Sequence, residues 1–167
     1  METNSLLEYY QSARISPVAY TVETWKTHFE RRDSIYRQIG ASSPVFRGSK
    51  VVEIAAGSGQ NAAYIASQKP SRFDLVEPNE VALADIASTF KNLPFEHTLP
   101  RVYPQRLEEF SPDTKYDVVV CENWLGSSNE ERKLRRKLSN FVNPGGLVIS
   151  NCVNFAGFLP NVLRRMI

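Results

Sequence analysis

The sequence predicts an α/β protein with a Rossmann-like open, mostly parallel sheet and helices on both faces of that sheet. From Lys50 onward, short β-rich runs alternate with stretches of helical periodicity. Such alternation is typical of right-handed crossover connections between parallel strands. The run at residues 118–120 is three consecutive valines, and a strand that is apolar on both faces belongs in the middle of a covered sheet. We expect about five strands in the order 3-2-1-4-5, with a helical segment before them.

Residues 1–48 differ from the rest and are predicted to form an N-terminal helical cap segment. Within residues 21–40, apolar side chains recur at helical spacing and Gly40 provides a stop: Trp25, Phe29, Tyr36 and Ile39. A shorter helix is expected around residues 6–10. Residues 49–167 are expected to form the second unit, which carries the alternating strands and helices.

The elements of this second unit follow in order along the chain. We expect strands at residues 51–54, 73–76, 101–105, 116–121 and 147–153, and helices at residues 60–68, 80–91 and 156–166. A further helix, capped by Ser127 or Ser128, ends at about Phe141. Pro104 marks the third strand as an edge strand, because proline cannot donate to a central ladder. The run at residues 144–146, Pro-Gly-Gly, is interpreted as a turn into the last strand.

Composition narrows the class of partner. The chain has 167 residues, is 23% charged and carries a formal net charge of +2, which gives no reason to expect nucleic acid. No apolar run approaches the roughly 20 residues of a membrane span, and no signal peptide is visible. His28 and His97 are isolated in the sequence, so no metal site is predicted. Cys121 and Cys152 each lie in an apolar, strand-like segment, which is weak evidence for a disulfide and favours a reducing compartment. We expect a cytoplasmic protein with a small-molecule substrate.

The most informative segment is a glycine-bearing loop between the first strand and the helix after it. Gly57 and Gly59 let the backbone turn tightly and approach a ligand closely. The loop follows the carboxyl end of a strand, which is where open α/β sheets bind ligands. Glu77 ends the next strand and is placed to accept hydrogen bonds from the two hydroxyls of an adenosine ribose.

Two nucleotide cofactors fit this pattern. Residues 57–62 satisfy the dinucleotide fingerprint G-x-G-x-x-A, with Glu77 as the ribose acid, so an NAD(P)-binding oxidoreductase stays open. Glu53 favours another cofactor, because a fixed negative charge beside the loop would repel a pyrophosphate and attract an amino group or a sulfonium. The residues therefore favour S-adenosyl-L-methionine.

Four segments in this order resemble the class I S-adenosylmethionine-dependent methyltransferases. Residues 53–59 are similar to the first motif of that family, with Ala55 where glycine is usual, and residues 75–79 to the second. Residues 116–120 resemble the fourth strand and residues 143–149 the turn before the fifth. Alanine at position 55 permits the turn if its φ stays negative.

The resemblance implies that residues 49–167 form an S-adenosylmethionine-binding, methyltransferase-like domain. It also implies S-adenosyl-L-methionine as cofactor, S-adenosyl-L-homocysteine as product, and a set of cofactor-binding residues. In that set Gln105 stands where relatives often place an acid against the adenine amino group. The set is Glu53, Ala55, Ala56, Gly57, Ser58, Gly59, Asn61, Glu77, Pro78, Asn79, Gln105, Arg106 and Glu122.

Acceptor-side residues are expected after the fourth strand and in the N-terminal segment. Glu122 and Asn123 are the candidate catalytic residues, and Trp124, Tyr9 and Tyr10 are candidates to bind the substrate. Members of the resembling family usually continue with two further strands, for which residues 154–167 leave room for one helix only. A second interpretation is therefore a cofactor-binding module or fragment that is inactive alone. A partner, a second copy or a missing C-terminal region would then cover the edge of the fifth strand.

Overall fold

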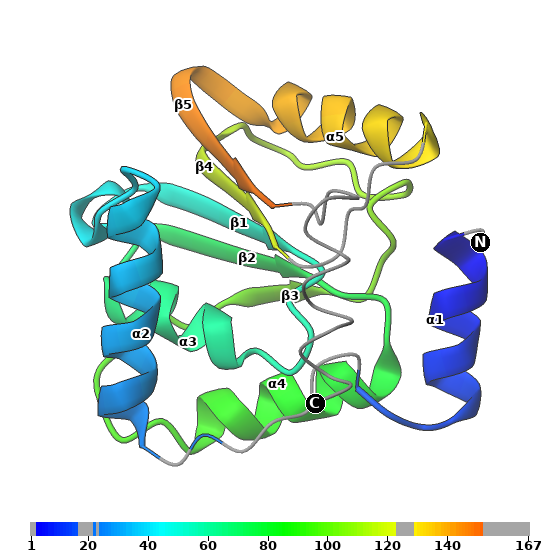
Figure 1. Cartoon of the computed structure of the whole chain (residues 1–167), viewed down its shortest axis with the longest axis horizontal. Coiled ribbons are helices and arrows are strands. Elements are labelled where there is room, and N and C mark those ends of the chain that lie inside the picture. Colours follow the sequence, from blue (N-terminus) through cyan, green and yellow to red (C-terminus); the bar gives the residue numbers. More distant parts are fainter. Residues whose placement is uncertain (1–2, 17–21, 23, 123–128, 152–167) are drawn as a thin grey trace, which may run out of the picture.

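A parallel sheet forms the centre of the structure (Figure 1). This computed structural model describes residues 3–16, 22, 24–122 and 129–151. Within those residues the sheet has five strands, in the spatial order β3-β2-β1-β4-β5, and every neighbouring pair is parallel. The predicted fold class and strand order are confirmed. The strands are β1 (Lys50–Ile54), β2 (Arg72–Val76), β3 (Arg101–Tyr103), β4 (Tyr116–Cys121) and β5 (Val142–Ser150).

Helices cover both faces of this sheet (Figure 1). Their bounds are α1 (Thr3–Ser12), α2 (Trp25–Gln38), α3 (Gln60–Ser67), α4 (Glu80–Lys91) and α5 (Asn129–Phe141), with a short 3-10 turn η1 (Ser43–Val45) after α2. The side chain of Thr24 caps α2 and that of Asn79 caps α4, as expected of residues whose oxygens accept an otherwise unpaired backbone N–H. None of the helices in the described ranges is long and apolar enough to cross a membrane.

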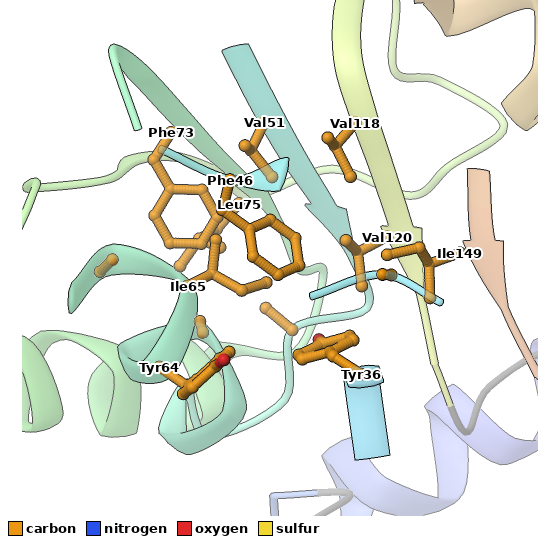
Figure 2. Close-up of a cluster of buried hydrophobic side chains, with 14 of the residues drawn as sticks. Tyr36, Phe46, Val51, Tyr64, Ile65, Phe73, Leu75, Val118, Val120 and Ile149 are labelled. Atoms are coloured by element: carbon orange, nitrogen blue, oxygen red, sulfur yellow. The ribbon is translucent and has the colours of Figure 1, made fainter. Parts of the chain in front are cut away.

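The pleat of the sheet divides the core into two apolar clusters. Val51, Leu75 and Val120 point to the face covered by α2, α3 and α4, where Figure 2 shows them with Tyr36 and Tyr64. The neighbours of these strand residues point to the other face, against α5. Successive side chains alternate between the faces of a strand, so each strand contributes to both clusters. Tyr36 of α2 is fully buried in the first cluster, so the N-terminal segment shares the core of the sheet.

The fifth strand departs from the prediction. It begins at Val142, directly after α5, and the predicted turn at residues 144–146 lies inside it as an irregularity in its pairing with β4. A side chain at Gly146 would put its Cβ 2.7 Å from the carbonyl oxygen of Asp117, so a close backbone approach explains the glycine. The predicted helix at residues 156–166 and the caps at Ser127 and Ser128 lie outside the described residues.

Candidate functional site

The loop between β1 and α3 turns by placing alternate residues in the left-handed region. The φ angles are +59° at Ala55, +55° at Gly57 and +80° at Gly59. The expectation that φ stays negative at Ala55 is wrong. The Ala55 N–H donates to the carbonyl of Val76 at 2.8 Å, which holds the backbone in place despite the cost of about 1–2 kcal/mol for a residue with a Cβ.

At Gly59 the loop packs closely against α4. It is the N-cap of α3, and a Cβ there would lie 3.1 Å from Cγ1 of Ile86 in α4. Only glycine combines this positive φ with that approach. The N-terminus of α3 therefore stands at the carboxyl end of β1, where the helix dipole favours a ligand with partial negative charge.

Glu77 joins the loops that follow β1 and β2. Its Oε2 accepts from the Gly57 N–H at 2.8 Å, and its Oε1 accepts from the Asn79 N–H at 2.9 Å. The residue is buried, and burial raises the pKa of Glu77 although the two N–H donors act in the opposite direction. Each carboxylate oxygen can accept more than one hydrogen bond, so this residue can hold the loop and still receive ligand hydroxyls.

Three glutamates meet on one face at the carboxyl ends of three neighbouring strands. Glu53 pairs in register with Leu75 of β2 and Val120 of β4. Glu77 and Glu122 each lie two residues beyond those partners. Because the side-chain period of a strand is two, all three carboxyl groups project toward the face that α2 covers.

Glu53 is, like Glu77, almost fully buried. It is 4% exposed, and its Oε2 has no hydrogen-bond partner within the described part of the chain. Burial raises the pKa of Glu53 to about 8, with a contribution from the nearby charge of Glu122 and opposition from Arg32. The raised pKa favours the neutral carboxyl in the free protein, in place of the fixed negative charge that the sequence led us to expect. A cation placed beside it would restore the charge.

Glu122 is held by two residues of α2. Nη2 of Arg32 forms a buried ion pair with Glu122 Oε2 and also donates to the Tyr36 hydroxyl at 2.6 Å. Burial acts against the charged guanidinium, but Tyr36 and Glu122 together raise the pKa of Arg32 above its usual value. This buried ion pair thus connects α2 of the N-terminal segment to the end of β4.

Sequence reasoning missed Arg32, although a signal was present. Trp25, Phe29 and Tyr36 define the apolar stripe of α2, and Arg32 falls on that same stripe, three residues after Phe29 and four before Tyr36. A cation on the buried face of a helix requires a partner, because an unpaired buried charge is costly. That partner is 90 residues away in the sequence, and no local pattern connects the two.

The other predicted cofactor residues lie around the same loop. Ser58 is buried, and its hydroxyl donates to Oε1 of Gln60 at 2.8 Å. Asn79 is buried and accepts from the Ala82 N–H at 2.9 Å. Ala56 is buried in the loop, Asn61 lies in the first turn of α3, and Pro78 stands between Glu77 and Asn79.

The predicted residues after β3 and in α1 are more exposed. Gln105 is exposed and follows β3, and Arg106 beside it is half-buried. Tyr9 is 60% exposed and its ring lies edge-on to that of Tyr10, 5.7 Å between centroids. The segment after α1 reaches the start of α4, where Asn79 Nδ2 donates to the Ile15 carbonyl at 3.4 Å. Asn123 and Trp124 lie outside the described residues.

Neither a reactive thiol nor a metal centre competes with this site in the part of the chain that the structure describes. Cys121 is buried, and burial together with the nearby Glu53 raises the pKa of its thiol to about 12, so the thiol is neutral. No group of three or more His, Cys, Asp or Glu side chains in the described ranges is arranged to hold a metal ion. Cys152 lies outside those ranges.

Comparisons with known proteins indicate a methyltransferase domain. A family model described as a methyltransferase domain matches residues 52–148, which is more than half of the chain. The matched range begins in β1 and ends in β5, so it contains the loop, Glu53, Glu77 and Glu122. No curated protein sequence matches the chain.

Solved methyltransferase structures share the fold. Magnesium protoporphyrin IX methyltransferase from Synechocystis PCC 6803 with bound SAH aligns at a TM-score of 0.69 and 17% identity, covering 98% of this chain and 77% of that one. The DhpI-SAM-HEP complex aligns at 0.59 and 19% identity, covering 95% and 70%. The N-methyltransferase NodS from Bradyrhizobium japonicum aligns at 0.57 and 17% identity, covering 73% and 67%. At these identities the likeness concerns the fold.

Proposed function

Because this chain belongs to the methyltransferase domain family, whose class I members use S-adenosyl-L-methionine, we propose that it transfers a methyl group from that donor to a small-molecule acceptor. The observation that carries the proposal is the pair of acids at the glycine loop. Glu77 holds the loop from the end of β2, and Glu53 stands buried beneath it with an unpartnered oxygen within the described residues.

The donor set fits the chemistry of this cofactor. The proposed ribose ligand is Glu77, whose oxygens accept one backbone N–H each and retain capacity for two hydroxyls. The proposed ligand of the amino group is Glu53, because an ammonium supplies both the donor and the charge that its Oε2 lacks. The loop residues 55–59 and the start of α3 would lie against the rest of the cofactor, with Gln105 and Arg106 on the side of the adenine.

When bound, S-adenosyl-L-methionine supplies an activated methyl group for in-line displacement and leaves as S-adenosyl-L-homocysteine. The protein's own contribution is to hold the two reactants in line, which needs rigid supports. Glu77 supplies one by tying two loops together, and Gly59 supplies another through its close packing on Ile86.

On the acceptor side we propose Glu122 and Asn123 as the residues that orient the acceptor, with Trp124, Tyr9 and Tyr10 lining its pocket. Glu122 already accepts from Arg32, so a role in positioning fits it better than early proton abstraction. The net charge of +2 supports a small molecule over nucleic acid. The fold alone does not select an acceptor, since the similar structures include a putative RNA methyltransferase from Pyrococcus horikoshii.

Calorimetry with S-adenosyl-L-homocysteine tests the cofactor assignment. The Glu77→Ala variant should bind it about 1–3 kcal/mol more weakly, because hydrogen bonds to a charged acceptor are lost. Glu80→Ala is the matched control, since that exposed acid begins α4 three residues later and should leave the affinity unchanged. Circular dichroism should show that both variants are folded.

Two results would contradict the proposal. Failure of the folded wild-type chain to bind at millimolar ligand would exclude the cofactor, and tighter binding of NAD(H) would favour the oxidoreductase alternative. Tight binding without any S-adenosyl-L-homocysteine formed from the donor across a panel of small acceptors would favour the binding-module alternative.

A further inference from the structure

The two oxygens of the Glu122 carboxylate lie in different surroundings. Oε2 accepts from Nη2 of Arg32 and, at 3.4 Å, from the Tyr36 hydroxyl. Oε1 accepts no hydrogen bond from any residue that the structure describes, and the whole side chain is 8% exposed. Arg32 and Tyr36 therefore hold one oxygen in place, and the other is available to a ligand.

The chemistry of this second oxygen restricts what can contact it. Glu122 is the anion of a buried ion pair, and an ionised carboxylate only accepts hydrogen bonds. A group that contacts Oε1 must therefore carry an N–H or an O–H. Amines and alcohols meet this condition, whereas the oxygens of a carboxylate or a phosphate would be repelled.

Arg32 does not make this an anion-binding site. Its Nε has no hydrogen-bond partner in the described part of the chain, which leaves one donor for an anion. However, Nε–H and Nη2 lie on the same edge of a planar guanidinium, and Nη2 already binds Glu122. An anion on Nε would therefore lie beside the Glu122 carboxylate, so the ion pair disfavours an anionic methyl acceptor.

We propose that the methyl acceptor of this site is an amine, and that Oε1 of Glu122 accepts a hydrogen bond from the nitrogen that is methylated. The inference rests on the proposed function, in which Glu122 orients the acceptor, and it names the class of compound that is oriented.

The charge movement in the reaction favours an amine over an alcohol. The neutral amine attacks the methyl carbon with its lone pair, the carbon–sulfur bond breaks, and the electrons of that bond stay on sulfur. Positive charge thus moves to the nitrogen, where a nearby carboxylate stabilises it, and the N-methylammonium then releases a proton to solvent. An alcohol would need a base to remove its proton, and Glu122 is already engaged by Arg32.

Sinefungin tests the placement of Glu122 without the natural acceptor. In this analogue of S-adenosyl-L-methionine, a carbon that bears an ammonium group replaces the sulfonium and its methyl. Wild-type protein should bind sinefungin more tightly than S-adenosyl-L-homocysteine in calorimetry. Glu122→Gln should reduce that preference about ten- to a hundredfold, the factor expected for a lost charge-assisted hydrogen bond, and should leave the affinity for S-adenosyl-L-homocysteine unchanged.

Two further variants control for effects on the fold and on general charge. Glu80→Gln is the matched control, because this exposed acid at the start of α4 should leave the preference as in the wild type. Glu122→Gln keeps an oxygen that can accept from Arg32. If it does not fold, the double variant Arg32→Met/Glu122→Met removes both buried ions and should show the same reduced preference.

A panel of matched acceptors tests the reaction itself. Benzyl, cyclohexyl and n-hexyl skeletons are each offered as the primary amine, the alcohol and the carboxylic acid. Formation of S-adenosyl-L-homocysteine from S-adenosyl-L-methionine measures methyl transfer. It should be fastest with the amine of a matched set.

The outcomes separate the inference from the proposed function. Equal affinities for sinefungin and S-adenosyl-L-homocysteine, or a preference that persists in folded Glu122→Gln, overturn the inference alone. Faster methylation of a carboxylic acid or an alcohol than of the matched amine also overturns it alone. If wild-type protein binds neither ligand, or no acceptor yields product, the inference and the proposed function are both overturned.

Discussion

Each face of the sheet buries a polar cluster, and the two clusters differ in whether the buried acid contacts the cation beside it. On the α5 face, Asp74 Oδ2 accepts from Arg72 Nε at 2.8 Å and from the Tyr116 hydroxyl at 2.5 Å. On the α2 face, no hydrogen bond or ion pair joins Glu53 to Arg32, and each leaves a buried atom unpaired within the described residues.

The difference suggests different uses for similar side chains. The first cluster joins β2 to β4 across the strand between them, and its acid is in direct contact with its cation. One oxygen of Asp74 still has no partner in the described ranges, so this contact is not complete either. In the second cluster the cation contacts Glu122 and not Glu53, which leaves Glu53 available to a ligand. We therefore expect the first cluster to serve stability and the second to serve binding.

The largest expected effect is on the α5 face. Asp74→Ala should lower the free energy of unfolding by about 3 kcal/mol, because it leaves Arg72 and the Tyr116 hydroxyl without their shared acceptor. Urea denaturation measures this change. Asp113→Ala is the matched control, since that exposed acid also contacts Arg72, at 2.7 Å, and should cost less than about 1 kcal/mol. Loss of S-adenosyl-L-homocysteine binding by folded Asp74→Ala would contradict the assigned division of roles.

The second-largest expected effect is that stability and ligand binding depend on pH through the Glu53 carboxyl on the α2 face. The pKa of Glu53 is raised by burial to about 8, from an ordinary value of 4.5. The unfolded chain therefore loses this proton first, and the contribution of Glu53 to the stability of the free protein should decline as pH rises from about 4.5 to about 8. A ligand ammonium favours the ionised carboxyl, so binding should change in the opposite direction.

We expect the affinity for S-adenosyl-L-homocysteine to rise about tenfold between pH 6.5 and pH 8, with a proton released on binding. Calorimetry in buffers of different ionisation enthalpy measures both quantities. Glu53→Gln keeps the shape of the side chain but cannot titrate, so it should bind more weakly and without this slope. A slope that persists in Glu53→Gln would assign the titration to another group.

The smallest effect concerns the loop beneath the second cluster. Ala55 has a φ of +59°, which costs about 1–2 kcal/mol for alanine, whereas glycine loses about 0.5–1 kcal/mol of chain entropy. Ala55→Gly should therefore stabilise the protein by up to about 1 kcal/mol in urea denaturation. Gly57→Ala, at a φ of +55°, should have the opposite sign. Destabilisation by Ala55→Gly would show that the methyl group contributes packing that outweighs the strain.

Much of the fold was predictable because its signals are local. The stop at Gly40 and the apolar run of β4 both act within a few residues of their own position. The start of β5 was not predictable in this way. The Pro-Gly-Gly run is typical of a turn, but it lies inside β5, at an irregularity in the pairing with β4 where the backbone at Gly146 closely approaches the Asp117 carbonyl.

The properties of the site likewise divide into those with a local signal in the sequence and those that depend on distant contacts. The sequence by itself determined the parallel sheet, the loop after β1 and the positions of Glu53 and Glu77. Strand periodicity and glycine spacing are patterns of neighbouring residues, so they can be recognised without the tertiary structure. The tertiary structure alone decided that Ala55 is left-handed, that Glu53 is buried deeply enough to hold a proton, and that Arg32 contacts Glu122. These properties depend on burial and on contacts between distant segments, and electrostatic energies are set by that surrounding medium.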